Sequence, residues 1–531
     1  MIKQRSILST LKRYTHSKRL NAVSSLSHEV ILNEDKNEDP RNLSAAESQL
    51  IDNLPIFKNV TITPSTPSSL KVKQEYVQVK ISFLKPLFGT TSQPLLGYNL
   101  PRNSKSPFID THKSQGINRL SVTKLLTKSW CELRFTYDMY AQAGLQIQPP
   151  PDKFLTSGTS IHGSLETALH PGLLDWNLEH DLFDVWFDSL LKMANLFQGG
   201  QCREIIAHGY VNSNDLTLLD GDMDVTDEDD VLISGVIDHL TLRGKDVRLF
   251  PDVNDIGALL MELDKHRELI KGDTNILVSD VKTRSINRLP TQGTVLKATK
   301  LQLMYYKFFL KSFGLNQEST YKKLLVNAQR RGIDVDAPID PMKLLNFMIS
   351  SNGFLNDDMR KMRDGFDIGF PLFDNENSSN NNNDAEFNMS NIPSIDSEVG
   401  VNNNILEKYE EFMTSWTRPV NLKYFAARMS QFYYNIGQLI SDELMVEYYH
   451  KNENFHNILF KYDNKMLKEH VTDSGKYWFG KRDIEPIKPN LKNFKIFCKN
   501  CDYSHVCSWR IEGEKKCKEL GQDLLNLNET D

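Results

Sequence analysis

The chain alternates between stretches with the apolar spacing of helices and stretches with that of strands. Apolar residues recur every three or four positions over Asp181–Leu196 and Lys297–Phe313, which predicts two helices. Shorter apolar-rich stretches predict strands at Arg203–Tyr210, Val231–Leu242 and Ile276–Lys282. A helix followed by a strand meander, another strand and another helix indicates an α/β core with a mixed central sheet flanked by helices.

The remaining sequence divides into further ordered parts and polar tracts. A strand is expected at Val72–Phe83, and helices at Tyr409–Trp416 and Leu422–Tyr448. The tract Asp374–Asn404 carries too little apolar surface to fold. The acidic run Asp220–Asp230 holds seven carboxylates but lacks the glycine and terminal glutamate register of a calcium loop. We interpret this run as a solvated hairpin tip.

The first 28 residues have the composition of a targeting segment. They contain no Asp or Glu, and six Lys or Arg residues. Basic, hydroxyl-rich and amphipathic sequence of this kind is typical of a mitochondrial transit peptide, which predicts a protein of the mitochondrial matrix. The expected parts of the chain are a transit peptide 1–28, a disordered linker 29–70, a core 71–373 with an acidic insert 220–230, an Asn-rich linker 374–404 and a helical region 405–531.

Composition excludes several classes of protein. In 531 residues with 39% hydrophobic content there is no run of the roughly 18 apolar residues that a membrane span needs, so we expect no membrane partner. The formal charge of −6 excludes a basic coat over the whole surface. Four of the six cysteines lie within Cys498–Cys517, which argues against a disulfide framework. No G-x-x-x-x-G-K-[ST] motif is present, so no ATP-driven motor is expected.

Two strand-like stretches carry the residues of a possible catalytic site. Asp238 ends the apolar run Ser234-Gly-Val-Ile-Asp, and Asp280 and Lys282 lie two apart in a later one. Strand residues two apart project from one face, so Asp280 and Lys282 point together, and Asp238 joins them if the strands are neighbours. Two carboxylates and a lysine suit hydrolysis of a phosphodiester with Mg²⁺ or Mn²⁺. The alternative is a salt bridge at a strand end.

Two pairs at helical spacing accompany these strands. His162 and Glu166 are four apart, and so are Gln302 and Tyr306. His162 could offer an imidazole to the same metal, or be a core histidine bonded to the backbone. Gln302 and Tyr306 could order the lysine or touch a phosphate, or be part of an amphipathic face.

The charge along the chain changes sign beside these motifs. From Lys282 to Arg331 there are eleven Lys or Arg and one acid, Glu318. Such a stretch could neutralise phosphates along a nucleic-acid path. The residues that we expect to bind the strand there are Arg284, Arg288, Lys297 and Lys300.

The C-terminal cysteines have the spacing of a metal site. Cys498, Cys501 and Cys507 form C-x2-C-x5-C, and a tetrahedral soft site needs a fourth ligand. The candidates for the fourth ligand are Cys517, His505 and the distant Cys131. Zinc accepts any of these ligands, whereas a [4Fe–4S] cluster typically has four thiolates. Cys202 lies in an apolar stretch and is interpreted as a buried hydrophobe.

Taken in order, these motifs resemble the exonuclease V family of fungal mitochondria, in the RecB-like branch of the PD-(D/E)xK nucleases. The resemblance runs from Ser121 to Trp509 and rests on Trp130-Cys131-Glu132, Gly158…His162…Glu166, Gly235-Val-Ile-Asp238, Asp280-Val-Lys282-Thr-Arg284, Gln302…Tyr306 and Tyr477-Trp-Phe-Gly-Lys-Arg482. It implies a restriction-endonuclease-like core and a helical C-terminal region closed by an iron–sulfur cluster.

The resemblance also implies roles for single residues. His162, Asp238 and Asp280 would hold the catalytic Mg²⁺, with Lys282 as the active-site lysine and Glu166 beside them. Gln302 and Tyr306 would match the family's QxxxY motif. The cluster ligands would be Cys131, Cys498, Cys501 and Cys507, which leaves Cys517 outside the set. Asp280 is a departure, because many relatives have glutamate there.

The implied activity is hydrolysis of single-stranded DNA from a free end, 5′ to 3′, with release of short oligonucleotides, in mitochondrial DNA maintenance. We expect a monomer that could work beside a single-strand-binding protein. A non-catalytic iron–sulfur or zinc protein that binds single strands, and an endonuclease on structured DNA, are the alternative functions.

Overall fold

A computed structural model describes residues 106–141, 165, 181–220, 229–245, 248–290, 293–379, 387–391, 407–487, 493–504, 507, 509–515 and 519. Several sequence predictions therefore lie outside the described residues: the transit peptide 1–28, the linker 29–70, the strand Val72–Phe83, His162, Glu166, His505 and Cys517.

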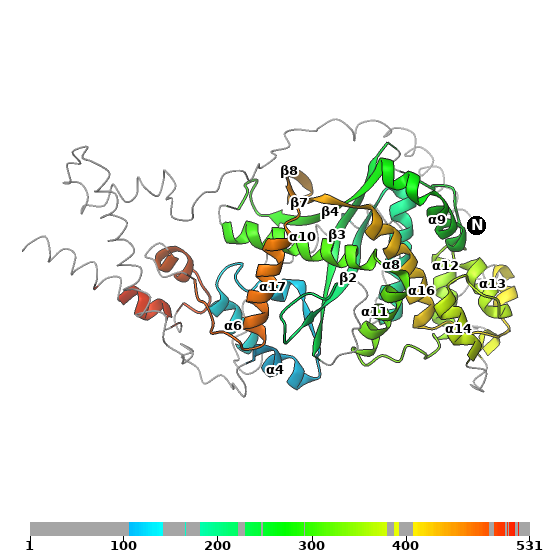
Figure 1. Ribbon diagram of the computed structural model, residues 1–531, viewed down its shortest axis with the longest axis horizontal. Helices are drawn as coiled ribbons and strands as arrows, with labels where there is room; N and C mark the ends of the chain where they lie inside the picture. The colour runs from blue at the N-terminus through cyan, green and yellow to red at the C-terminus, as the bar shows by residue number, and fades with distance from the viewer. Residues whose placement is uncertain are drawn as a thin grey trace, which may run out of the picture.

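A six-stranded mixed sheet forms the centre of the molecule (Figure 1). Its strands are β1 (Arg119–Ser121), β2 (Gln201–Asn212), β3 (Asp230–Gly244), β4 (Thr274–Arg284), β7 (Ile440–His450) and β8 (Glu453–Lys461). The order is β1-β3-β4-β7-β8, and β2 also pairs with β3. The pairs β1–β3 and β4–β7 are parallel, and β2–β3, β3–β4 and β7–β8 are antiparallel. The predicted mixed α/β architecture is confirmed.

Strand β3 is the longest strand of the sheet, and two other strands share one of its edges. Strand β2 pairs along almost all of β3. On the opposite edge, β1 pairs with Leu232–Ser234 and β4 pairs with His239–Gly244. Residues 235–238 therefore lie between the ends of β1 and β4. This interruption leaves room in the sheet at the level of Asp238.

Helices cover the sheet and extend it at both ends. They are α4 (Pro107–Thr111), α5 (Val122–Leu125), α6 (Glu132–Ala141), α8 (Leu182–Gly199), α9 (Ile256–Asp273), α10 (Gly293–Phe313), α11 (Gln317–Gln329), α12 (Pro341–Ser350), α13 (Asn356–Asp364), α14 (Pro371–Ser379), α16 (Leu422–Leu439) and α17 (Asn464–Trp478). Helices α11 to α14 and α16 gather at one end of the sheet, and α4, α6 and α17 gather at the other (Figure 1). None of the helices among the described residues is long and apolar enough to cross a bilayer.

The two helices and three strands predicted for the core are confirmed. Helix α8 starts where Asp181 and Asp184 form a capping box, in which each side chain accepts from the other residue's backbone N–H. Its apolar face is buried against β2 and α16. Helix α10 packs against the sheet, α16 and α17. Cys202 is fully buried on β2, as expected.

The prediction of helix after residue 404 is wrong in two places. Tyr409–Trp416 forms only a short 3-10 turn and the two-residue strand β6 (Ser415–Trp416), which pairs with β5 (Phe387–Asn388). The helix from Leu422 ends at Leu439, and the chain continues as β7. From Leu444 the apolar period changes from 3.6 to 2, and β7 and β8 complete the central sheet.

The polar tract Asp374–Asn404 is ordered in part, contrary to the prediction. Helix α14 covers its start, and Asp374 accepts three backbone N–H groups, from Ile368, Gly369 and Phe370. Buried Phe387 supplies some of the apolar contact that the composition of the tract did not indicate. The acidic run 220–230 does lie in the connection of the antiparallel pair β2–β3, although residues 221–228 are not described.

The helices at the far end of the sheet contain a buried ion pair. Arg428 on α16 donates to Asp358 on α13, with Nε to Oδ2 at 2.7 Å, and both side chains are at most 2% exposed. The Tyr424 hydroxyl also donates to Asp358, at 2.9 Å. Because the two charges are removed from water, each depends on the other for compensation.

Replacement of Asp358 by alanine is expected to lower the free energy of unfolding by about 3–5 kcal/mol, because it leaves the Arg428 guanidinium buried without its counter-charge. Denaturant-induced unfolding followed by circular dichroism measures this change. The control is Asp357→Ala on the same helix, where a half-exposed ion pair with Lys361 is lost and the expected cost is below about 1 kcal/mol. Equal costs for the two variants would contradict the prediction.

Candidate active site

Asp280 and Lys282 point to the same side of β4, as their spacing predicts. The Lys282 Nζ lies 2.8 Å from Asp280 Oδ2 and 3.0 Å from Oδ1. The Asp280 side chain is fully buried, while a third of the Lys282 side chain is exposed. The ammonium therefore compensates a buried carboxylate, while part of the lysine side chain remains exposed.

Asp238 joins this pair at the point where β3 and β4 separate. The last paired residues are His239 and Ser279, so Asp238 and Asp280 follow on the two diverging strands. Asp238 Oδ2 accepts the backbone N–H of Val281 at 2.8 Å. The two carboxylates and the lysine thus lie together, as the sequence predicted.

Gln302 and Tyr306 extend the site from helix α10. The Lys282 Nζ donates to Gln302 Oε1 at 3.1 Å, and Gln302 Nε2 donates to the Tyr306 hydroxyl at 3.2 Å. Both α10 residues are buried. Tyr306 rests against Gly235 of β3, where an added Cβ would lie 2.6 Å from the ring. Of the alternatives left open by the sequence, ordering of the lysine by Gln302 agrees with these contacts.

The electrostatics of the site favour a charged lysine and a neutral phenol. Burial disfavours the Lys282 ammonium, but the charges of Asp280 and Asp238 outweigh it and raise the lysine pKa. Burial raises the pKa of Tyr306, and the carboxylates of Asp280, Asp238 and Glu204 add to the effect. Lys282 is therefore cationic and Tyr306 a hydrogen-bonding phenol at neutral pH.

Two residues of this region were not predicted. Tyr448 of β7 pairs with Lys282 in the sheet register, but the wrong helix prediction for its segment concealed it. Glu204 stands where β2 passes Asp238, and it has a left-handed φ of 55°. Such a backbone conformation is costly for a residue other than glycine and concentrates at functional sites. No sequence pattern marks it.

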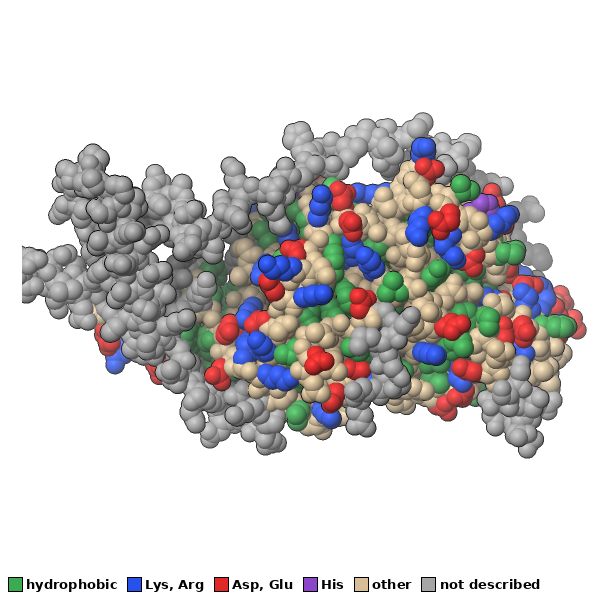
Figure 2. Space-filling view, viewed as in Figure 1, with side chains coloured by type: hydrophobic (Ala, Val, Ile, Leu, Met, Phe, Trp, Pro, Cys, Tyr) green, Lys and Arg blue, Asp and Glu red, His purple; other side chains and the backbone are tan. Residues whose placement is uncertain are grey.

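The basic stretch does not form one continuous track. Lys307 and Lys323 are buried, with Lys307 paired to Asp442 at 2.5 Å and Lys323 donating to Ser312. On the face shown in Figure 2, basic and acidic side chains are mixed. The four residues expected to bind the nucleic-acid strand differ in exposure. Arg288 and Lys297 are exposed, and Arg284 and Lys300 are half-buried.

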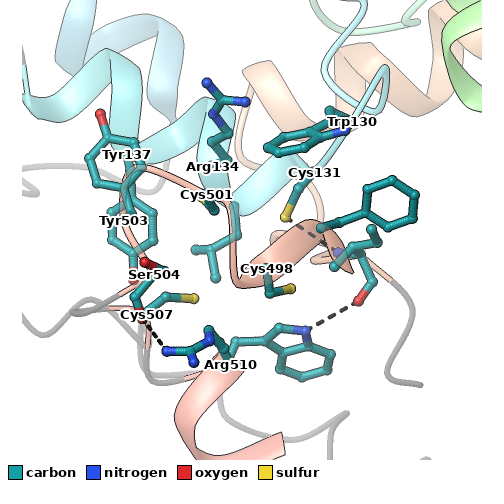
Figure 3. A pocket seen from close by; sticks show the side chains of 14 residues that line it. Trp130, Cys131, Arg134, Tyr137, Cys498, Cys501, Tyr503, Ser504, Cys507 and Arg510 are labelled. Carbon is teal, nitrogen blue, oxygen red and sulfur yellow. Dashed lines mark hydrogen bonds between the residues drawn. The ribbon is translucent and has the colours of Figure 1, made fainter. Parts of the chain in front are cut away.

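The four cysteines of the expected cluster line one pocket. Cys131 precedes helix α6, and Cys498, Cys501 and Cys507 come from the C-terminal segment (Figure 3). The backbone N–H of Ile487 donates to Cys131 Sγ at 3.4 Å. Burial and the neighbouring thiols raise the pKa of Cys498 to about 12 and that of Cys501 to about 11. The thiols are thus close enough to oppose one another's ionisation.

Aromatic residues and one buried ion pair hold this pocket together. Its aromatic walls are formed by Trp130, Tyr137, Phe497, Tyr503 and Trp509. The two Arg482 Nη atoms donate to the Glu132 carboxylate, at 2.6 Å each, and Glu132 is fully buried. This bidentate pair fixes the residue next to Cys131 against the C-terminal part of the chain.

The two donor sets differ in how they could hold a metal. Among the described residues, no three His, Cys, Asp or Glu side chains are gathered closely enough to hold a single ion. Asp238 and Asp280 nevertheless provide the hard oxygen ligands that Mg²⁺ prefers. The four cysteines provide soft ligands around a common space in an apolar wall, which is the donor set that an iron–sulfur cluster requires.

Comparison with known proteins decides the family. A family model described as "Exonuclease V - a 5' deoxyribonuclease" matches residues 106–510. The chain belongs to the exonuclease V family. A protein named "Exonuclease V, mitochondrial" from Vanderwaltozyma polyspora is 38% identical over 95% of this chain and 97% of its own length. Proteins of the same name from Saccharomyces cerevisiae and Kluyveromyces lactis are 38% and 36% identical, over 91% and 89% of this chain and 90% and 93% of their own lengths.

Membership of the exonuclease V family confirms the resemblance found in the sequence. It also confirms the expected class of enzyme, a hydrolase that acts on DNA. The relatives' names support the mitochondrial location predicted from the first 28 residues. The matched range contains every candidate residue of the active site and all four cysteines of the pocket.

Replacement of Gly235 by alanine tests the packing that places Tyr306. The new Cβ would overlap the Tyr306 ring, so we expect a loss of about 1–3 kcal/mol of stability and lower DNA cleavage. Chemical unfolding and a nuclease assay measure the two effects. Gly293→Ala is the control. Gly293 is the first residue of α10, the helix that carries Tyr306, and a Cβ there would meet nothing within 4 Å. If Gly235→Ala is as stable and active as the parent, Tyr306 is not held against β3.

Proposed function

We propose that this protein is a Mg²⁺-dependent exonuclease that hydrolyses single-stranded DNA from a free 5′ end and serves mitochondrial DNA maintenance. The observation that carries the proposal is the grouping of Lys282 with Asp280 and Asp238 where β3 and β4 separate. Family membership gives the class of enzyme, and these residues would form the site for it.

The residues of the site would divide the work as follows. Asp238 and Asp280 would hold Mg²⁺, with Mn²⁺ as a substitute and His162 as a further ligand. The ion, when bound, would polarise a phosphoryl oxygen and lower the pKa of a coordinated water. Lys282 would stabilise the negative charge that develops on the phosphoryl group. Gln302 accepts from the same ammonium and so would hold its direction.

Single-stranded DNA is the substrate that fits the rest of the chain. The sequence has no phosphate loop of a motor ATPase, so the enzyme would have to act on strands that are already separated. Arg284, Arg288, Lys297 and Lys300 lie on β4, after it and along α10, from where they would neutralise backbone phosphates.

We also propose that the cysteine pocket holds one [4Fe–4S] cluster. Cys131 and Cys498 are 367 positions apart in sequence, yet both line the pocket. Thiolate ligation would offset the burial and the mutual repulsion that raise the thiol pKa values. Such a cluster would join the segment at the start of α6 to the C-terminal end of the chain.

Lys282→Ala and Asp280→Ala are expected to lower Mg²⁺-dependent cleavage of end-labelled single-stranded DNA at least about 100-fold. The first variant loses the cation that would stabilise the transition state, and the second loses a carboxylate that would hold the metal. Binding of the same DNA should remain within a few-fold of the parent. Lys271→Ala, at an exposed position near the end of α9, serves as the matched control. Cleavage within tenfold of the parent in Lys282→Ala would contradict the catalytic assignment. Cutting of circular single strands would instead indicate an endonuclease.

Cys131→Ser is expected to remove the visible absorbance of a cluster and most of about four iron atoms per chain, because one of four thiolate ligands is lost. Iron analysis and an absorption spectrum of the protein purified without oxygen measure this. Cys202→Ala is the control, since that thiol is buried in β2 away from the pocket. A colourless protein that contains zinc would overturn the iron–sulfur assignment.

A further inference from the structure

A second cavity, of about 390 Å³, adjoins helix α10. It lies between the residues that follow α5, the N-terminal half of α10 and α17. Its apolar lining consists of Leu126, Ala298, Leu301 and Met466. Its polar lining consists of Lys128, Ser129, Thr294, Lys297, Glu469, His470 and Asp473. A volume of this size is in the range of small-molecule sites, which are roughly 300–1,000 Å³.

The cavity is close to the candidate active site along α10. Ala298, Gln302 and Tyr306 are successively four residues apart, so they follow one face of the helix. Four residues span about 6 Å of helix. Nucleotides of one strand in a duplex are about 3.4 Å apart along the axis. The cavity is therefore within one or two nucleotide steps of Gln302 along the helix.

Among the described residues, the two lysines that line the cavity differ in their ion pairs. Lys128 is paired with Asp473 and Glu485, at 2.7 and 2.6 Å, and Arg482 also contacts Asp473. Lys297 is exposed, and no hydrogen bond or ion pair involves it among the described residues. Lys297 is thus positioned to contact a phosphate whose nucleotide enters the cavity.

His470 is one of the residues that line the cavity, and its ring lies edge-on to Tyr305. Its Nε2 is buried and has no hydrogen-bond partner among the described residues. The ring bonds the backbone carbonyl of Leu125, so Nδ1 is the nitrogen that carries the proton. Burial, with Lys297 and Lys128 nearby, lowers the His470 pKa to about 4. At neutral pH, Nε2 is therefore an acceptor with an unused lone pair.

We propose that this cavity binds one nucleobase of the DNA strand, next to the nucleotide at the catalytic site. The base would lie on the surface of Leu126, Ala298 and Leu301, and a small rotation of the His470 ring would let one of the base N–H groups donate to Nε2. Its phosphate would contact Lys297. This proposal rests on the function proposed above and assigns to it a base-binding subsite.

The first test measures base burial directly. Oligothymidylates with a single 2-aminopurine at successive positions from the 5′ end are mixed with the inactive Lys282→Ala protein, and the 2-aminopurine fluorescence is recorded. We expect one position to change its emission far more than the others. Ala298→Met, which fills the cavity with a helix-compatible side chain, should abolish that difference. Emission that changes equally at all positions would overturn the proposal and indicate that another segment or no ligand occupies the cavity.

The second test measures turnover in the active protein. His470→Phe keeps an aromatic ring beside Tyr305 but removes the Nε2 acceptor and the bond to Leu125, so KM for single-stranded DNA should rise roughly three- to tenfold with kcat within about twofold. His266→Phe, on α9 and outside the cavity, is the matched control. If the His470→Phe and Ala298→Met proteins still cut single-stranded DNA with the KM of the parent, the proposed subsite is contradicted. The nuclease assignment is then unaffected. A parent protein that neither binds nor cuts single strands overturns both.

Discussion

The buried carboxylate of Asp280 is the constraint on which the candidate site depends. A charged group without exposure to water costs several kcal/mol unless a counter-charge compensates it. Lys282 provides that charge from two residues away on the same strand, and Gln302 accepts from the same ammonium. The separation of β3 and β4 exposes the Val281 N–H to Asp238 and admits the second carboxylate. The burial of Asp280, its ion pair with Lys282 and the end of the β3–β4 pairing thus bring two carboxylates and a lysine into one site.

The cysteine pocket depends on a different tie between distant segments. The Glu132 carboxylate accepts hydrogen bonds from Arg482, from the Thr127 hydroxyl and from the Glu485 N–H. Its charge is therefore compensated without a metal. The Thr136 hydroxyl also bonds Tyr477, at 2.8 Å. These contacts bring the residues around Cys131 to the C-terminal segment by themselves. Side-chain contacts within the chain therefore already form this junction, and a cluster would strengthen it. Loss of the cluster need not unfold the core around the central sheet.

The sequence contained enough information for the strands of the candidate site but not for the whole sheet. Alternation places Asp280 beside Lys282, and the i,i+4 spacing places Gln302 beside Tyr306, because both relations are local. The strand β7 was missed because the apolar run of α16 continues into it without a turn residue, from Leu439 to Ile440. The continuous basic track expected from residues 282–331 failed for a related reason. A count of charges does not show that Lys307 pairs with Asp442, 135 residues away.

Helix α10 links the candidate active site and the cavity that we propose binds a base, and the position of the helix depends on its close approach to the sheet. A Cβ at Gly209 would lie 2.4 Å from Phe309, and one at Gly235 would lie 2.6 Å from Tyr306. Both glycines are on the paired strands β2 and β3, so the helix sits closer to the sheet than side chains there would allow. A shift of α10 away from β3 would move Gln302 from Lys282 and Ala298 from the cavity together. The geometry of the candidate site and the proposed fit of a DNA strand would therefore be coupled through this helix.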